Sequence, residues 1–529
     1  MLSRVSGLVR EGFLSRLFGA GSALDAFVVG YRIPNLTRDL FAEGALSSAF
    51  VPTFVEYLQN KDKKEAAHLA NLVATSIILL VGGICILGVI FSPWLVGLVT
   101  QGWVQTAPEK YRMAVLLTQI MFPFLLLVAL AAQAMGILNA LNQFAVPAFS
   151  STWFNVGSVA AGIVIGFWMG PSLGIEPIVG MAIGVVIGGA LQLAWQIPSL
   201  LRAGFSFRPA FDFSHPGLRH IYRLMGPAII GNASVQINVL VNTFFATSIY
   251  DPVRGLDGPT AWLNYAFRFM QLPLGLFGVA IGTATLPAIG RSAASGDIDE
   301  FRETLARSLG LVFVLTVPAS AGLMILGPSI VGAIYEGAKF QAYDTQQTAI
   351  ALTYYAIGLA GYAAVKVLAP AFYALKDSRT PMWTSLWSIA INAGMAWLLV
   401  RKFSLGHAGL ALSTSCVAMF SFLVLFFAMR GRIGGVYGRR LRSTVLKVLA
   451  GSVLMAAAVW LSTRAVHLLI GVSTFSRLVD LAVSIPFGLA VVYFACRAMK
   501  VEELEMAVRA FGGPISRRFG ASGDGPEAG

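Results

Sequence analysis

Long apolar runs separated by short polar connections recur along the whole chain. Runs such as Leu69–Val99, Met113–Leu138 and Leu478–Ala495 are long enough to cross a hydrocarbon core of about 30 Å as a helix. About 14 such runs can be placed, and the alternating segments of about 10 residues that a membrane β-barrel needs are not found. The pattern predicts an all-α polytopic membrane protein with about 14 transmembrane helices.

Segments of the first half return in the second half. Residues 49–52, 91–97 and 139–147 resemble 284–287, 326–332 and 373–381, at an offset of about 235 residues. The offset covers six helices, an even number, so both halves share one orientation. The repeat predicts two six-helix bundles, 1–215 and 216–440, related by a pseudo-two-fold axis along the membrane normal. Two further helices follow within 441–500, and 501–529 forms a cytoplasmic tail.

The low number of charged residues supports a membrane protein, and their distribution predicts its orientation. Only 12% of the residues are charged and 57% are hydrophobic, whereas soluble proteins carry about 25% charged residues. The connections after even-numbered runs, with the tail, hold about 23 Lys and Arg, against about 8 after odd-numbered runs, which predicts cytoplasmic termini. Most of the net charge of +13 comes from this excess of Lys and Arg in one set of connections, and we expect no soluble basic face for nucleic acid.

No motif of enzyme chemistry is found. The chain lacks a P-loop, a nucleophile elbow and a zinc motif, so we expect no enzyme, no cofactor and no ATP-driven transport by this chain alone. Cys85, Cys416 and Cys496 lie in apolar runs and imply no disulfide.

Seven basic residues lie inside or at the edge of apolar runs instead of in the connections. They are Arg4, Arg10, Arg16, Arg32, Arg38, Arg268 and Lys366. A cation at the bilayer centre costs at least ~2.5–3.5 kcal/mol, so it normally faces a watery cavity or a partner. The group predicts a cationic cavity for an anionic cargo.

A charged stripe runs along the second apolar run. Asp25, Arg32 and Asp39 are spaced seven residues apart, and Asn35 and Glu43 join the same helix face. One interpretation is an ion-pair ladder that locks helices together. The other is the lining of a hydrated cavity, which is favoured because cations outnumber acids in the apolar runs.

A set of short stretches distributed along the chain carries a family resemblance. They are Ser3–Gly7, Arg10, Phe18–Gly21, Asp25–Phe27, Pro34–Leu36, Phe41–Pro52, Gly226–Ala228, Tyr265–Arg268, Leu286–Pro287 and Lys366–Pro370. Together they resemble the MurJ/MviN family of lipid II flippases, within the multidrug/oligosaccharidyl-lipid/polysaccharide exporter superfamily. The resemblance covers nearly the whole chain, and Phe41–Pro52 is its most specific part.

The resemblance implies a bacterial inner-membrane protein that moves the undecaprenyl-pyrophosphate-linked peptidoglycan precursor outward. It also implies functional residues: cavity arginines at Arg4, Arg10, Arg38 and Arg268, acids at Glu11 and Asp25, and weak sodium ligands at Asn238, Asn242 and Asp377. The chain departs from the family pattern at Glu11, usually Asp, at Asp39, often basic, and at Gln271, often Glu. The lipid tail would follow a groove at helices 13 and 14, with cell-wall synthesis machinery as a partner.

The residues fit that cargo, and alternatives stay open. Pyrophosphate is a compact polyanion, and arginine binds phosphate oxygens in a bidentate manner. The same arginines would bind another polyprenyl-pyrophosphate-linked oligosaccharide. A drug or cation antiporter would need acids in its cavity, and a non-transporting scaffold would pair all its arginines. Energy would come from a sodium ion or from the membrane potential.

Overall fold

The structure is a computed structural model that describes residues 2–39, 47–436 and 438–506. Most of these residues are in helices, and β-structure among them is limited to an isolated bridge between Asp251 and Gly255. This confirms the all-α prediction. The chain divides into two compact units: unit 1 is Met1–Asn264 with Tyr335–Asp344, and unit 2 is Tyr265–Ile334 with Thr345–Gly529.

Unit 1 begins with two helices of 17 residues each. Its helices are α1 (Leu2–Phe18), α2 (Ser22–Arg38), α3 (Ser47–Asn60), α4 (Lys63–Val99), α5 (Gln101–Thr106), α6 (Pro108–Met121), α7 (Pro123–Ala140), α8 (Ala145–Ile163), η2 (Val164–Met169), α9 (Gly170–Leu173), α10 (Pro177–Ala194), α11 (Ile197–Arg202) and α12 (Pro216–Ala246). The helix α13 (Pro259–Pro273) starts in unit 1 and ends in unit 2.

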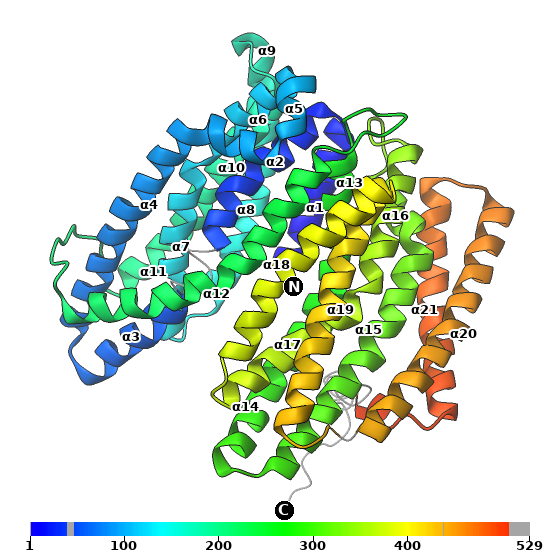
Figure 1. The fold of residues 1–529 in the computed structure, drawn as a ribbon. Coiled ribbons are helices and arrows are strands. Elements are labelled where there is room, and N and C mark those ends of the chain that lie inside the picture. The colour runs from blue at the N-terminus through cyan, green and yellow to red at the C-terminus, as the bar shows by residue number, and fades with distance from the viewer. Residues whose placement is uncertain (1, 40–46, 437, 507–529) are drawn as a thin grey trace, which may run out of the picture. The chain divides into compact units, whose positions relative to one another are not determined.

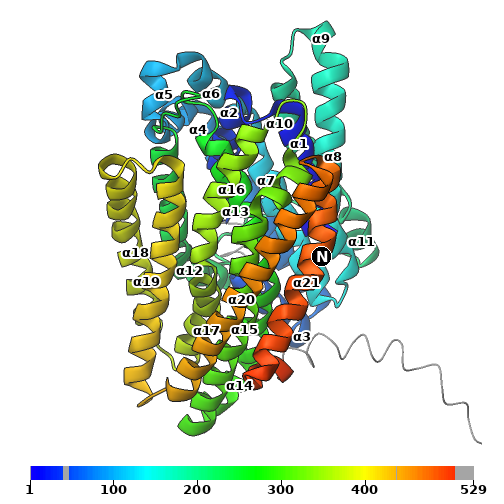
Figure 2. The same ribbon diagram turned by 90° about the vertical axis from the view of Figure 1, so that its right-hand side faces the viewer.

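Unit 2 contains the remaining helices (Figures 1 and 2). They are η3 (Leu274–Gly278), α14 (Val279–Ser295), α15 (Ile298–Tyr335), α16 (Ala342–Ile357), α17 (Leu359–Ala374), α18 (Arg379–Trp397), η4 (Leu398–Lys402), α19 (Gly406–Arg432), α20 (Gly438–Ile470) and α21 (Thr474–Ala498). The first residues of α16 belong to unit 1.

Within the described residues, ten helical segments are long and apolar enough to cross a membrane. An eleventh appears if α16 and α17, which meet at a bend of 42°, are counted as one span. A polytopic membrane protein is thus confirmed, whereas the number of 14 spans stays a prediction. The helices α1 and α2 fall outside the ten because each has 17 residues, and both carry charges.

The core of unit 1 is built where α3, α4, α7 and α12 meet. Phe50 and Phe54 of α3 pack with Leu69 of α4, Leu125 of α7 and Ile221 of α12, all buried. Burial of each such side chain contributes roughly 1.5–3 kcal/mol to the free energy of folding. This packing places α12 in unit 1, so the contact boundary falls at 264 where the repeat predicted a division at 215. The repeat relation itself stays a prediction.

Close packing of α8 on α10 positions one wall of the site described below. A Cβ at Gly184 would lie 2.4 Å from the Ser158 carbonyl oxygen, and one at Gly180 would lie 2.3 Å from the Gly166 Cα. Side chains larger than hydrogen would force the helices apart. Such small-residue contacts are the usual means of bringing membrane helices together.

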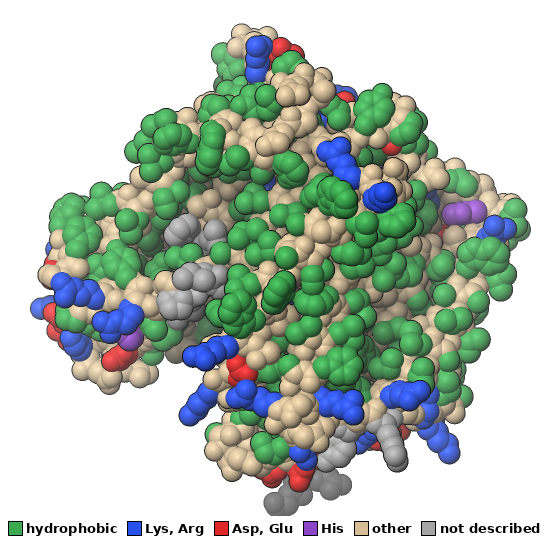
Figure 3. Space-filling model, viewed as in Figure 1, with side chains coloured by type: hydrophobic (Ala, Val, Ile, Leu, Met, Phe, Trp, Pro, Cys, Tyr) green, Lys and Arg blue, Asp and Glu red, His purple; other side chains and the backbone are tan. Residues whose placement is uncertain are grey.

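Unit 2 has a core of α14, α15, α17 and α19, to which α20 and α21 add a helical hairpin. The two hairpin helices lie side by side in both ribbon views. Leu326 of α15 packs with Met455 and Val459 of α20. In Figure 3, Lys and Arg side chains gather near the lower ends of α14, α17 and α19, while hydrophobic side chains cover the helix flanks above them. Arg430 and Arg432 lie in the last turn of α19.

Candidate functional site

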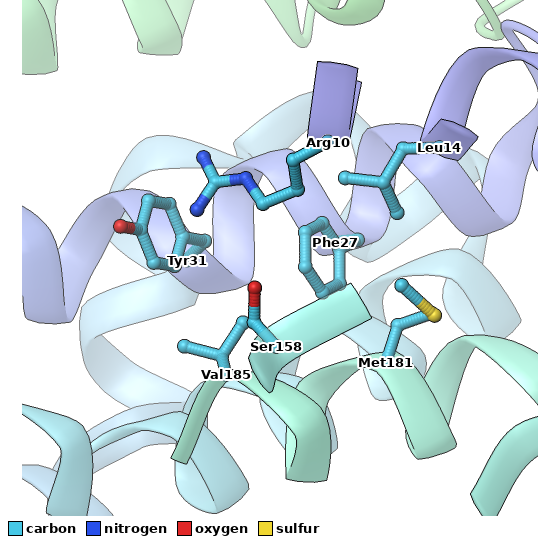
Figure 4. A pocket seen from close by; sticks show the side chains of 7 residues that line it. All are labelled: Arg10, Leu14, Phe27, Tyr31, Ser158, Met181 and Val185. Atoms are coloured by element: carbon cyan, nitrogen blue, oxygen red, sulfur yellow. The ribbon is translucent and has the colours of Figure 1, made fainter. Parts of the chain in front are cut away.

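A pocket in unit 1 contains one of the predicted cavity arginines. It holds about 280 Å³ of space, part of it open to the surroundings. Four helices line it: α1, α2, α8 and α10 contribute Arg10, Leu14, Phe27, Tyr31, Ser158, Met181 and Val185 (Figure 4). The guanidinium group of Arg10 points toward Tyr31. The pocket is therefore apolar, with a cation in its wall.

Aromatic faces and one loose ion pair surround Arg10. Its Cζ lies 5.9 Å from the centroid of the Tyr31 ring and 5.3 Å from that of Phe154. Its Nη2 lies 3.8 Å from the Glu11 Oε1, and only 12% of the side chain is exposed. Aromatic rings attract a cation without accepting its hydrogen bonds in full. Among the described residues, the buried Arg10 Nε has no acceptor.

Glu11 is buried on another side of α1. Its Oε2 accepts a hydrogen bond from the Tyr335 hydroxyl at 3.5 Å, and the Ser15 hydroxyl reaches the Tyr335 carbonyl at 3.3 Å. These contacts hold α1 against the end of α15 within unit 1. Glu11 thus has a partner other than Arg10.

Asp25 is fully buried and engaged on both carboxylate oxygens. Its Oδ2 accepts from the Lys110 ammonium at 2.8 Å and from the Gly258 backbone N–H at 2.9 Å, and its Oδ1 accepts from the Ala261 N–H at 2.9 Å. The sequence pattern missed Lys110, because it stands in a polar connection beside Pro108 and Glu109. The sequence offered one indication that Lys110 could be buried, because its connection directly precedes an apolar run.

The charged residues of α2 that the structure describes have partners of several kinds. Arg32 donates to the Thr243 hydroxyl at 2.8 Å, and Arg38 pairs with its neighbour Asp39 at 2.8 Å. The Asn35 Oδ1 is buried without a hydrogen-bond partner among the described residues. Arg38 and Asp39 therefore pair with each other, whereas Arg32 and Asp25 contact residues of other helices or turns of unit 1.

The other predicted residues lie apart from the pocket or outside the described part. Glu43 falls in the undescribed segment 40–46, and Arg4 lies in α1 with a side chain that is not described. Arg268 is half-buried on α13 in unit 2, and Lys366 is exposed on α17. Arg16 is exposed on α1.

The three sodium candidates are not brought together within either unit. Asn238 and Asn242 lie on α12 in unit 1, and Asp377 lies in the turn before α18 in unit 2. The Asn238 amide donates to the Ser234 carbonyl at 3.1 Å. Asp377 accepts from the backbone N–H groups of Arg379 and Thr380 and pairs with Arg432 at 2.7 Å. No group of three or more His, Cys, Asp or Glu in the described ranges could hold a metal.

Comparisons with known proteins identify the family of the chain. The family model described as lipid II flippase MurJ matches residues 14–479. The probable lipid II flippase MurJ of Vibrio cholerae is 35% identical over 503 residues, which cover 92% of either chain. The lipid II flippase MurJ of Burkholderia cenocepacia is 33% identical over 441 residues, covering 83% of this chain and 82% of that one. The chain belongs to the MurJ family.

Solved structures extend the likeness to the fold. A lipid II flippase MurJ in an inward closed conformation matches with a TM-score of 0.75 and 25% identity, covering 94% of this chain and 97% of that chain. An inward-facing multidrug MATE transporter matches with a TM-score of 0.66 over 82% of this chain and 96% of its own, at 15% identity, and shows the shared fold alone. The MurJ family consists of membrane transporters, so the expectation that the chain is not an enzyme is confirmed.

Proposed function

We propose that this protein moves lipid II, the undecaprenyl-pyrophosphate-linked peptidoglycan precursor, from the inner to the outer leaflet of the bacterial cytoplasmic membrane. The names of its relatives supply the cargo. The observation that carries the proposal is Arg10, whose guanidinium lines a pocket and whose buried Nε lacks an acceptor among the described residues. A buried, incompletely bonded cation is costly, and an anionic ligand compensates that cost.

In this proposal the pyrophosphate binds to arginines in an apolar setting. A low dielectric strengthens each contact, and the guanidinium fork matches phosphate oxygens. Arg10 is the central ligand, and the remaining members of the site are Arg4, Arg38 and Arg268, with Glu11, Asp25, Arg32, Asn35 and Glu43 lining or shaping the cavity.

The transport cycle is alternating access, with both termini in the cytoplasm and the lipid tail following a groove at α20 and α21. The membrane potential supplies energy because its negative inside favours outward movement of an anionic head. A sodium ion near Asn238, Asn242 or Asp377 is the second candidate for coupling. Cell-wall synthesis enzymes would receive the exported precursor.

The test is to replace Arg10 in protein reconstituted in vesicles. Arg10→Ala should weaken lipid II binding by roughly 10- to 100-fold, since hydrogen bonds to charged groups contribute about 1.5–3 kcal/mol. Arg10→Lys should retain part of the binding, because the charge survives without the fork. Lipid II binding and leaflet exchange are measured together with complementation of a bacterium depleted of its own flippase.

Arg112→Ala serves as the matched control, because Arg112 pairs with Glu109 on an exposed helix face. It should leave binding unchanged. Unchanged lipid II binding in Arg10→Ala would contradict this site. Equal exchange of another polyprenyl-pyrophosphate oligosaccharide would favour the broader exporter over a dedicated lipid II flippase.

A further inference from the structure

The hairpin of α20 and α21 in unit 2 buries a carboxylate that the Arg10 pocket does not involve. Asp480 lies in the second turn of α21, and its side chain is fully buried. Its Oδ1 accepts from the Thr463 hydroxyl at 2.9 Å and from the Ser484 hydroxyl at 2.7 Å, and its Oδ2 accepts from the Ser329 hydroxyl. These three donors are neutral. A buried negative charge held by neutral donors keeps part of the cost of leaving water.

A histidine lies beside the same carboxylate. The Nε2 of His467, on α20, is 4.0 Å from the Asp480 Oδ2 and is buried with no hydrogen-bond partner among the described residues. A quarter of the His467 side chain is nevertheless exposed. Histidine is the side chain that ordinarily changes its charge between about pH 5 and 8. When protonated, His467 places a positive charge beside Asp480, and when neutral it leaves the carboxylate to the hydroxyl groups.

The pair lies near the end of the hairpin where the two helices are joined. His467 is in the last turn of α20, which ends at Ile470, and Ser473 caps the start of α21. The connection between the helices is the short segment 471–473. Water at this end can reach the exposed part of the imidazole, whereas the carboxylate is enclosed by the helices.

Two arginines complete the charged surroundings of this carboxylate. Arg477 precedes it by three residues on α21 and is buried, and its Nη1 would lie 2.5 Å from a Cβ placed on Gly332 of α15. Arg464 of α20 is exposed, and α15 contributes the uncharged Ser329. Arginine does not lose its proton in proteins. Among the described residues around the carboxylate, His467 is therefore the group whose charge changes between pH 5 and 8.

We propose that His467 and Asp480 form a proton-binding site that clamps the α20–α21 hairpin. A proton from the water at the joined end binds the imidazole, and the imidazolium pairs with the carboxylate. The pair then holds α20 to α21 and, through Ser329, the hairpin to α15. A group that gains its partner on protonation stabilises a structure at low pH, and this stabilisation is lost as the pH rises. In the proposed function the clamp regulates the tail groove, but the clamp itself does not depend on that function.

The experiment measures amide hydrogen exchange of residues 463–484 in the purified full-length protein at about pH 5.5 and about pH 8. Each rate is divided by the intrinsic exchange rate at the same pH. Polar contacts between membrane helices predict protection that is roughly 3- to 20-fold higher at the acid pH. Asp480→Asn and His467→Gln should each abolish this difference, because each removes one partner of the ion pair. The double variant should then show no further loss of pH dependence.

Two further variants separate the clamp from a general loss of packing. Ser484→Ala removes a neutral donor to Asp480, so it should lower protection at both pH values and keep the difference between them. His220→Gln, at an exposed histidine on α12 in unit 1, is the matched control and should keep the wild-type difference.

The outcomes are distinct for the clamp and for the proposed function. Equal protection of the wild type at both pH values would overturn the clamp, and so would a difference of wild-type size in Asp480→Asn. If Asp480→Asn fails to fold, His467→Gln decides alone: loss of the difference supports the clamp, and its persistence overturns it. No lipid II is present in these measurements. Wild-type protein that fails to bind lipid II would therefore overturn the proposed function and leave the clamp standing.

Discussion

Arg10 and Lys110 are two cations in apolar surroundings with opposite hydrogen-bond situations. Arg10 is flanked by aromatic faces and keeps a buried Nε without an acceptor among the described residues. Lys110 has all three donors engaged by Asp25, Asp257 and Leu256. The first can bind an anion without losing a protein contact, whereas the second would have to give one up. A cation with an unused donor suits ligand binding, whereas one whose donors are all engaged suits holding helices together.

At the turn before α18, the titration of Asp377 can be tested. Hydrogen bonds from Thr380, together with nearby Arg432, hold the pKa of Asp377 below its usual value. A group with a depressed folded pKa stabilises the protein above its unfolded pKa, and that stability is lost as pH falls through the folded pKa. Asp377→Ala should therefore lower the melting temperature at pH 7, at a cost of about 1 kcal/mol, typical of a lost helix cap.

Thermal unfolding of purified protein from pH 7 down to pH 3 measures this effect. The gap between wild type and Asp377→Ala should narrow toward the acid end, because protonated Asp377 no longer pairs with Arg432. Thr353→Ala, a hydroxyl that only bonds within its own helix, is the control. A gap that is constant with pH would contradict the argument.

Local pattern revealed Arg10 but not Lys110. Arg10 interrupts an apolar run, and an interruption is visible in the sequence. Lys110 stands among polar residues, and its partners are 85 and 147 residues away, so their pairing depends on tertiary packing. For the same reason the spacing of Asp25, Arg32 and Asp39 left an ion-pair ladder and a cavity lining both open and did not indicate that Asp25 contacts Lys110.

At the scale of helices, hydropathy predicts apolar segments but not where they break. The predicted run Met113–Leu138 falls on two helices, α6 and α7, which meet at Phe122. Pro123 begins α7, and proline cannot donate to the preceding turn. Phe122 itself keeps helical dihedral angles, so α6 and α7 continue as one membrane span, Pro108–Ala140. A hydropathy average registers the span but not the missing hydrogen bond at the proline.

The hairpin of α20 and α21 is held to α15 by a buried carboxylate. Asp480 on α21 accepts from the hydroxyls of Ser329 on α15 and Thr463 on α20, the latter at 2.9 Å. Polar contacts between membrane helices contribute about 0.6 kcal/mol on average and up to about 1.7. Asp480→Ala should thus destabilise the hairpin by roughly 1–2 kcal/mol.

Disulfide trapping of cysteines placed at Leu326 and Val459, which pack in one cluster, measures this loosening. Asp480→Ala should slow formation of the disulfide, and lipid II exchange should fall because the hairpin is the proposed tail groove. Val483→Ala, an exposed position on α21, should change neither rate. Trapping at the wild-type rate in Asp480→Ala would show that the carboxylate does not hold the hairpin.

For the whole molecule, sequence order and packing divide the chain differently. The repeat predicts bundles that meet at 215, whereas contacts assign α12 and the segment Tyr335–Asp344 to unit 1. A repeat reports the order of helices along the chain, while contact units report which side chains are buried together. Ile221 of α12 is buried with Phe54 of α3, and nothing in the spacing of apolar residues encodes that pair.

The last prediction concerns the energy of the transport cycle. An anionic headgroup moving outward gains about 2.3 kcal/mol per charge for each 100 mV of potential that is negative inside, whereas bound cations moving outward would lose that amount. Both units carry arginines of the proposed site. The net charge that moves with the cargo therefore decides whether the membrane potential favours or opposes transport. If the protein cations stay in place and the pyrophosphate moves, collapsing the potential should slow lipid II exchange. Vesicles with an imposed potassium diffusion potential, with and without an ionophore, measure this directly. Exchange at equal rates with either sign of the potential would remove the voltage-driven step and leave an ion gradient as the energy source.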